Sequence, residues 1–272
     1  MKACVFINLP AAADRRASVE ASFAAAQTAG WTLDRFEALD PSEVADTPGD
    51  LKPAEKACFA SHRGALGRHL ADEEPLLIVE DDTVFAPQAL AVLDALLGRF
   101  TDWDVIYTDV ALFDLASMLR LARGRDAMAR AGEFSILALD AIPYAGAGAY
   151  AVRGGAKRRL HAALSAPAGL DQPIDLFLRD LARGPDFRFG ACVPFLTAPA
   201  ELADQGSQIQ AQDSALFDAT LNIFRRTMWI ARDPEQSARD AAWLAAQAPG
   251  ETEQLLGGLF SVLAAPAFPL DR

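Results

Sequence analysis

The sequence is poor in cysteine and has no long apolar run, and each scarcity excludes a class of protein. Its three cysteines, Cys4, Cys58 and Cys192, lie far apart and form no CxxC pair. They predict neither a disulfide framework nor a zinc ligand set, and they suit a reducing cytosol. No stretch reaches the ~18 uncharged apolar residues that cross a bilayer, and the apolar N-terminal run is too short for a signal peptide. We therefore expect a cytoplasmic protein.

Basic side chains are also scarce relative to acidic ones. The chain has 25 Lys and Arg against 37 Asp and Glu, a formal net charge of −12. Such a surface repels a phosphate backbone, so we expect no nucleic-acid partner. A phosphorylated small molecule would need local basic residues or a metal ion. The 272 residues are otherwise of ordinary globular composition, 51% apolar and 23% charged, which excludes intrinsic disorder.

Apolar runs alternate with helical patterns over the first 210 residues. This alternation predicts an α/β fold with a mostly parallel sheet flanked by helices. We expect strands at 3–9, 32–39, 75–79, 103–109, 134–142 and 147–153, and a last strand with its exit loop over 188–199. We expect helices at 14–29, 53–72, 87–99, 115–130, 154–165 and 173–181.

The pattern changes at Asp213, after which it is helical only, with stretches at 213–231, 234–248 and 251–264. We expect one domain over residues 1–212 and a helical C-terminal extension over 213–272. The favoured interpretation is that the extension packs against the domain, because Trp229, Trp243 and Phe260 recur at helical spacing. A homodimer contact through these helices and a peripheral contact with a membrane are the alternatives.

Three acidic residues, Glu80, Asp81 and Asp82, follow the apolar strand PLLIV. Ligands of open parallel sheets bind beyond the carboxyl ends of the strands, so these side chains lie where chemistry usually occurs. Close carboxylates repel one another unless a cation joins them, and oxygen ligands suit Mg²⁺ or Mn²⁺ that also holds a diphosphate. In the alternative interpretation, Asp81 or Asp82 caps the next helix or lines a solvated loop.

Eight segments in order carry a resemblance to a known family. They are FINLPAAADRR (6–16), LDRFEALD (33–40), LKPAEKACFASHRGAL (51–66), PLLIVEDD (75–82), DWDVIY (102–107), GAGAYAVRGGAKRRL (146–160), PIDLFL (173–178) and QGSQIQ (205–210). In these segments the chain resembles glycosyltransferase family 25, the lipopolysaccharide galactosyltransferase-like family. The resemblance covers neither residues 111–133 nor the extension from 213.

The resemblance implies a GT-A-like fold and the activity of a hexosyltransferase. The expected donor is a UDP-sugar, with galactose as the best guess, and the expected acceptor is a glycan or lipid-linked saccharide such as a lipopolysaccharide precursor. The expected cofactor is Mn²⁺ or Mg²⁺, and the expected stereochemistry is inversion. The EDD triplet corresponds to the family's DxD element, with Asp82 as the main metal ligand, Glu80 as a second ligand, and Asp81 in support.

Further donor-site residues follow from the same match. Asn8, Arg15 and Arg16 come after the first strand, where the nucleotide lies in such folds, and arginine pairs well with phosphate oxygens. Ser61 and His62 match the family's SH pair and are expected to contact donor or acceptor. The alternatives are a solvated helix start for the two arginines and a structural hydrogen bond for His62.

Inversion needs a general base that deprotonates the acceptor hydroxyl. Asp175 in the PID motif is the first candidate and Asp171 the second, and helix N-terminal capping is the alternative for both.

Two other functions stay open. One is a family member that binds a nucleotide sugar without catalysis. The other is a receiver-like signalling domain in which Asp109 is the phosphoacceptor, although the hydroxyl and lysine of that chemistry lack clear counterparts here.

Overall fold

A seven-stranded sheet forms the centre of the computed structural model, which describes residues 1–26, 30–200, 215–247 and 250. In spatial order the strands are β2 (Trp31–Glu37), β1 (Lys2–Asn8), β3 (Leu76–Glu80), β9 (Ala149–Val152), β5 (Val105–Tyr107), β10 (Phe189–Val193) and β7 (Ser135–Ala138). β9 runs antiparallel to β3 and β5, and β7 runs antiparallel to β10, while the other pairs are parallel. The predicted mostly parallel sheet is confirmed.

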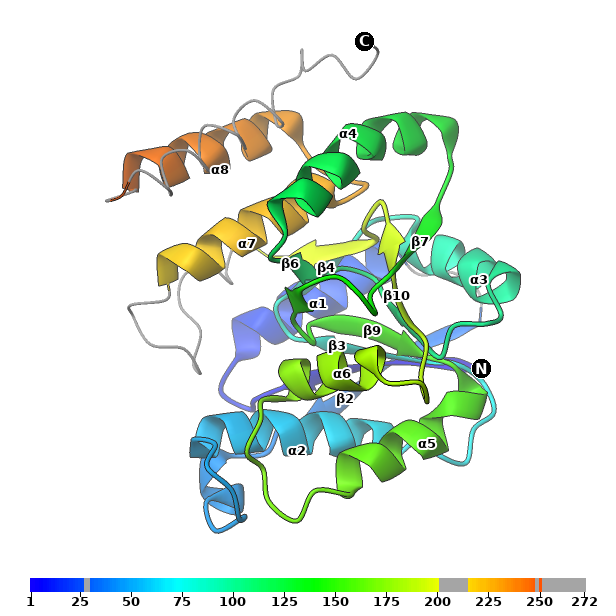
Figure 1. Cartoon of the computed structure of the whole chain (residues 1–272), viewed down its shortest axis with the longest axis vertical. Helices are drawn as coiled ribbons and strands as arrows, with labels where there is room; N and C mark the ends of the chain where they lie inside the picture. The colour runs from blue at the N-terminus through cyan, green and yellow to red at the C-terminus, as the bar shows by residue number, and fades with distance from the viewer. Residues whose placement is uncertain (27–29, 201–214, 248–249, 251–272) are drawn as a thin grey trace.

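Helices cover both faces of this sheet (Figure 1). On one face lie α2 (Pro53–Gly67), α5 (Gly154–Ser165) and α6 (Ile174–Arg183), and on the other lie α1 (Ala13–Ala26) and α3 (Ala89–Arg99). Successive residues of a strand point to opposite faces. Val5 and Ile7 of β1 therefore belong to the core under the first set, and Cys4 and Phe6 to the core under the second. Burial on both faces explains why the strands are uninterrupted apolar runs.

Two small sheets extend this centre, and the sequence did not predict them as separate elements. β4 (Thr83–Phe85) pairs with β11 (Thr197–Pro199), and β6 (Ala111–Leu112) pairs with β8 (Tyr144–Ala145). The last strand expected within 188–199 is confirmed as β10, which ends at Val193. The expected exit loop contains Pro194, which has no N–H for a ladder, and it leads into the short strand β11. A short 3-10 turn, η1 (Pro41–Val44), precedes α2.

The remaining helices are α4 (Leu115–Ala131), α7 (Ala215–Met228) and α8 (Pro234–Gln247). α7 packs against the small sheets and α4, and its residues Ile223, Phe224 and Met228 are buried in the main core. α8 packs on α7, and an ion pair from Arg226 to Asp240 at 3.1 Å links the two. The predicted packing of the extension against the domain is thus confirmed for α7.

Other expectations about the extension have mixed outcomes. The predicted domain boundary at 212 and the helix predicted at 251–264, with Phe260, lie outside the described residues. Trp229 packs against the core, whereas the side chain of Trp243 is 49% exposed. Among the described helices none has the length and apolar character needed to cross a bilayer.

Candidate functional site

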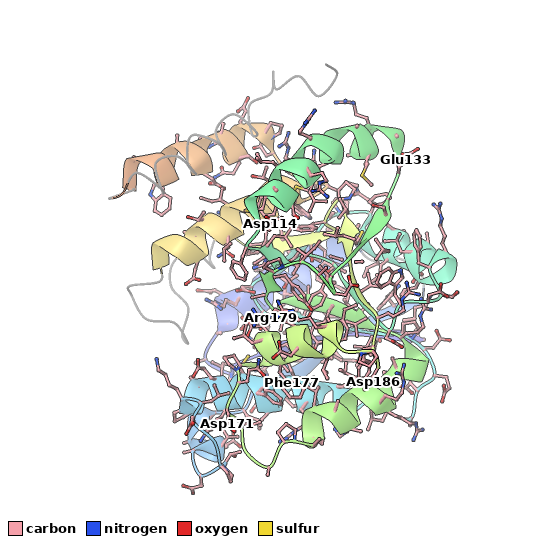
Figure 2. All side chains as sticks on the ribbon, viewed as in Figure 1. Asp114, Glu133, Asp171, Phe177, Arg179 and Asp186 are labelled. Atoms are coloured by element: carbon pink, nitrogen blue, oxygen red, sulfur yellow. The ribbon has the colours of Figure 1, made fainter. Side chains whose placement is uncertain are left out.

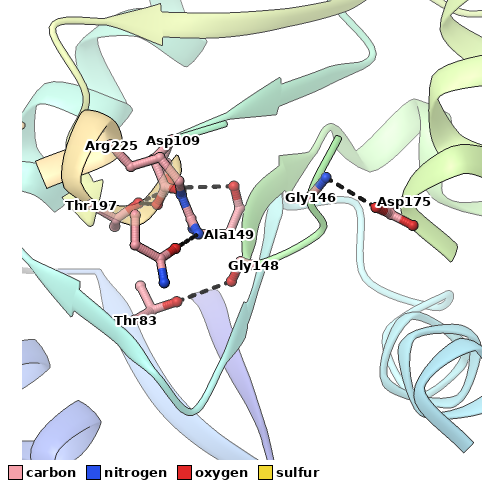
Figure 3. Close-up of polar contacts among 10 residues, drawn as sticks. Thr83, Asp109, Gly146, Gly148, Ala149, Asp175, Thr197 and Arg225 are labelled. Atoms are coloured by element: carbon pink, nitrogen blue, oxygen red, sulfur yellow. Dashed lines mark hydrogen bonds and ion pairs between the residues drawn. The ribbon is translucent and has the colours of Figure 1, made fainter. Parts of the chain in front are cut away.

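The acidic triplet occupies the turn between β3 and β4. Glu80 is the last residue of β3, Asp81 and Asp82 form the turn, and Thr83 begins β4. The backbone N–H of Glu80 donates to the carbonyl oxygen of Gly148 at 2.7 Å. The hydroxyl of Thr83 donates to the same oxygen at 3.0 Å (Figure 3). One carbonyl at the start of antiparallel β9 therefore holds both ends of the acidic turn.

The carboxylate of Asp81 is bound by the protein itself. It accepts hydrogen bonds from Nδ2 of Asn8 at 2.7 Å and from Nη1 of Arg15 at 3.3 Å. Burial raises the pKa of Asp81, and the hydrogen bond from Asn8 and the charge of Arg15 oppose that rise. Nε of Arg35 donates to Oδ1 of Asn8 at 3.0 Å, which fixes the amide. The structure thus brings Asn8 and Arg15 to the acidic turn as an orienting shell for Asp81.

Glu80 contacts the buried histidine of α2. Nε2 of His62 lies 3.2 Å from Oε1 of Glu80, and Nδ1 of His62 lies 3.0 Å from the hydroxyl of Tyr150. The two rings are stacked with centroids 5.8 Å apart, and His62 is fully buried. Burial opposes ionisation of Glu80, but the hydrogen bond and attraction of His62, with the charges of Arg225 and Arg15, outweigh it and lower the pKa of Glu80.

Asp82 differs from both neighbours, because its carboxylate makes no hydrogen bond or ion pair with any residue in the described part of the chain. Its backbone carbonyl accepts a hydrogen bond from the N–H of Ala200 at 2.6 Å. Burial, and then the negative charge of Glu80, raises the pKa of Asp82 to about 7. A cation beside Asp82 and Glu80 would relieve both effects. The residues present therefore fit a hard divalent cation that prefers oxygen ligands.

An arginine from α7 enters the same region, and the sequence reasoning missed it. Nε of Arg225 donates to Oδ1 of Asp109 at 2.7 Å, and Nη2 makes a second bond to the same oxygen (Figure 3). The side chain of Asp109 is 0% exposed and also accepts from the hydroxyl of Thr197. The charge of Arg225 acts on Glu80 and Asp82 as well. The sequence could have indicated this pair, because Arg225 follows the apolar residues Ile223 and Phe224, and a cation on a buried helix face needs an anionic partner.

These contacts leave the receiver-like interpretation without support. Asp109 is buried and ion-paired with Arg225, so its carboxylate is not free to accept a phosphoryl group. Receiver domains have the doubly wound strand order 2-1-3-4-5. In this sheet antiparallel β9 separates β3 from β5.

The two candidate bases lie in different surroundings. Asp175 is half-buried in the first turn of α6 and does not cap that helix; its Oδ2 accepts from the N–H of Gly146 at 3.4 Å (Figure 3). Its negative charge, with those of Glu80 and Asp82, raises the pKa of Cys58, so all three carboxylates lie near this thiol. Asp171 is exposed, accepts from the N–H of Asp50 at 2.9 Å, and lies at the loop beside α2 (Figure 2). The structure does not bring Asp171 to the acidic turn.

Two further residues that were predicted to contact the donor or acceptor, Ser61 and Arg16, have side chains that lie away from the acidic turn. The buried hydroxyl of Ser61 donates to the carbonyl of Ala57 at 2.7 Å and accepts from the N–H of Leu39 at 3.0 Å. It joins α2 to the segment after β2. Arg16 forms an exposed ion pair with Glu20 at 2.7 Å on the surface of α1. Neither side chain reaches the acidic turn.

The thiol of Cys58 lies one helical turn before His62. Its sulfur, a ring nitrogen of His62 and a carboxylate oxygen of Glu80 all lie within 4.8 Å of one another. Burial raises the pKa of Cys58, and the negative charges of Glu80, Asp175 and Asp82 add to the rise. The side of α2 that faces the acidic turn therefore has a strongly negative environment.

The chain is similar to two solved structures of a galactosyltransferase. The galactosyltransferase LgtC in complex with donor and acceptor sugar analogs aligns with a TM-score of 0.41 and 14% identity, over 70% of this chain and 72% of that chain. An active-site mutant of LgtC aligns with a TM-score of 0.44 and 12% identity, over 93% of this chain and 99% of that chain. No family model matches the chain, and neither does any curated protein. At these scores neither structure assigns the chain to a family, so membership of glycosyltransferase family 25 stays a prediction.

Proposed function

We propose that the chain is a divalent-metal-dependent glycosyltransferase of GT-A-like fold. It would transfer a hexose, with galactose as the best guess, from a UDP-sugar to a glycan or lipid-linked saccharide acceptor. The observation that carries the proposal is the carboxylate of Asp82, which has no hydrogen-bond or ion-pair partner among the described residues and lies beside Glu80 at the carboxyl end of β3. This position and the resemblance to family 25 agree on the same three residues.

The donor half of the site would use the residues around the acidic turn. Asp82 and Glu80 would hold Mn²⁺ or Mg²⁺, which supplies a positive charge that stabilises a departing diphosphate. Asp81 is already bound by Asn8 and Arg15, so its role is to fix the turn. Arg15 and Arg225 place two guanidinium groups beside the carboxylates, and such groups pair well with phosphate oxygens.

The acceptor half would use Asp175. Because Asp175 leaves its own helix uncapped and bonds only weakly to the N–H of Gly146, its carboxylate can accept a proton from an acceptor hydroxyl as that hydroxyl attacks. Attack on the face opposite to the leaving diphosphate inverts the anomeric carbon. His62 contacts Glu80 and Tyr150, so its proposed role is to orient Glu80.

Donor binding is tested by thermal unfolding with UDP, with and without Mn²⁺. A ligand that binds only the folded state raises the melting temperature by mass action. We expect a shift with UDP that requires Mn²⁺ in the wild-type protein and in Asp46→Asn, which changes an exposed carboxylate, and no shift in Asp82→Asn. A metal-dependent shift of wild-type size in Asp82→Asn would exclude Asp82 as a ligand.

Transfer is tested separately, with UDP-hexoses and saccharide acceptors. We expect Asp175→Asn to keep Mn²⁺-dependent UDP binding and to lose about 10²–10⁴-fold in the transfer rate, the contribution of a general base. The anomeric configuration of the product, read by NMR, tests inversion. If the wild-type protein binds UDP with Mn²⁺ but transfers no sugar to any acceptor, the interpretation as a non-catalytic nucleotide-sugar binder replaces this one.

A further inference from the structure

A second set of metal-binding side chains lies behind the acidic turn. Cys58 and His62 occupy positions i and i+4 of α2, which place both side chains on one face of the helix. Glu80 approaches that face from β3, and the three potential ligand atoms lie within 4.8 Å of one another. The arrangement joins a thiol, an imidazole and a carboxylate, whereas Asp82 and Glu80 alone offer only oxygen.

The separations suit a tetrahedral ion. Zinc binds sulfur at about 2.3 Å and nitrogen or oxygen at about 2.0–2.2 Å, so neighbouring ligands of a tetrahedral site lie roughly 3.4–3.6 Å apart. Nε2 of His62 is already 3.2 Å from Oε1 of Glu80, and no pair of the three ligand atoms is farther apart than 4.8 Å. The remaining gap to tetrahedral separations is therefore at most about 1.4 Å.

Tyr150 supplies the support that a metal-bound histidine usually has. Its hydroxyl lies 3.0 Å from Nδ1 of His62, and the two rings stack in a buried position. A tyrosine hydroxyl can donate or accept, so it can hold the tautomer that carries its proton on Nδ1 and leaves the Nε2 lone pair facing Glu80. Such an outer partner fixes ring orientation and raises the basicity of the ligand.

We propose that Cys58, His62 and Glu80 bind one Zn²⁺ ion through a thiolate, an imidazole and a carboxylate. On binding, the ion displaces the thiol proton of Cys58, which passes to solvent. The softer sulfur ligand selects zinc over Mg²⁺ and Mn²⁺. Three protein ligands leave the fourth position of a tetrahedral ion open.

Glu80 belongs to both ligand sets, and this has a regulatory consequence that rests on the proposed function. Zinc at Cys58 takes Glu80 away from Asp82, so zinc occupancy opposes Mn²⁺-dependent binding of the donor. The same carboxylate cannot serve both ions with full strength. Zinc would therefore act as an inhibitor that competes with Mn²⁺ and is relieved by a chelator.

The zinc site is tested with Co²⁺, a spectroscopic substitute, added to the apoprotein without any nucleotide. We expect a sulfur-to-cobalt charge-transfer band and tetrahedral d–d bands that saturate at one ion per chain and are abolished by Zn²⁺. Cys58→Ser should lose the charge-transfer band. Cys192→Ser, which removes a fully buried thiol from the opposite side of the sheet, should keep it. The readout does not depend on sugar transfer, so it fails or succeeds separately from the proposed function.

Three results would overturn the zinc site. They are no uptake of Co²⁺, octahedral bands without sulfur charge transfer, and a charge-transfer band that survives in Cys58→Ser. Thermal unfolding with Zn²⁺ gives a second measurement that needs no cobalt. Zinc should raise the melting temperature of the wild-type protein and of Cys192→Ser by more than that of Cys58→Ser, which keeps the acidic turn, and an equal shift in all three proteins contradicts the assignment.

Discussion

The pair formed by Arg225 and Asp109 gives the sharpest test of how α7 is held. Asp109 is 0% exposed, and Arg225 supplies two of its hydrogen bonds through Nε and Nη2. Arg225→Met keeps most of the apolar stem but removes the charge and both bonds. Asp109 is then left as a buried anion whose remaining side-chain partner among the described residues is the hydroxyl of Thr197.

The expected loss can be worked from this burial. Removing one partner of a buried ion pair costs about 3–5 kcal/mol, because the other charge stays desolvated. For a protein of this size, 1 kcal/mol shifts the melting temperature by roughly 2–4 °C, so Arg225→Met should melt about 6–20 °C lower. Asp109→Asn in the same chain removes the stranded charge, and the double variant should recover more than half of the loss.

The assay is thermal and urea unfolding of the wild type, both single variants and the double variant, read as a double-mutant cycle. Arg239→Met is the matched control, since Arg239 contacts Asp233 and Glu235 on the surface of α8 with 59% of its side chain exposed. Exposed pairs contribute about 0–1 kcal/mol. If Arg225→Met unfolds like Arg239→Met, the buried pair does not anchor α7 and the reasoning is refuted.

Three further predictions test single contacts. Ser61→Ala removes the acceptor of the Leu39 N–H, so urea unfolding should show a free energy of unfolding lower by about 1–3 kcal/mol, while the folded variant binds UDP as the wild type does. Loss of UDP binding in this variant would instead support Ser61 as a ligand contact. Asp82→Asn removes a charge that has no partner among the described residues and lies beside Glu80, so the metal-free variant should have a melting temperature no lower than that of the wild type. A clearly lower melting temperature would mean that Asp82 has a structural partner. A Cβ on Gly154 would lie 1.8 Å from the carbonyl oxygen of Glu73, whereas a Cβ on Gly155 meets nothing within 4 Å. Gly154→Ala should therefore melt at a clearly lower temperature than Gly155→Ala, and equal melting temperatures would contradict the predicted clash.

Much of the fold could be predicted because burial on both faces leaves a strong local signal. The run PLLIV and the run ACVFINL are apolar throughout, as strands covered on both faces must be, and β3 and β1 form there. β4, β6 and β8 have two or three residues each, which is too short for any periodicity to appear. The direction of β9 could not be predicted either, because an apolar strand has the same pattern whichever way it runs.

The acidic turn could be predicted from chain order alone, but its partners could not. Glu80, Asp81 and Asp82 are consecutive, and a strand end brings them to the edge of the sheet. Arg225 is 116 residues away from Asp109, in a segment that the family resemblance does not cover, so only tertiary packing joins them. The expectation that the chain has no zinc ligand set relied on the spacing between cysteines. The proposed zinc site contains one cysteine, so no spacing between cysteines could reveal it.

Ser61 and Arg16 are the predicted ligand contacts whose side chains the structure places away from the acidic turn, so for these two residues the contact stays a prediction. Both lie on helices close to predicted site residues, His62 and Arg15. A helix turns by about 100° per residue, so adjacent side chains point in different directions. His62 and Arg15 face the acidic residues, and their neighbours face the segment after β2 and the solvent.

The single carbonyl of Gly148 that holds both ends of the acidic turn has a consequence for the entropy of binding. Fixing the backbone of one residue costs about 1–2 kcal/mol, and a loose loop would lose that free energy each time a ligand ordered it. Here Asp81 and Asp82 lie between two residues already tied to β9, at 2.7 and 3.0 Å. The ordering cost is met once, when the sheet forms, so the carboxylates would offer the proposed ion a shape that folding has already set.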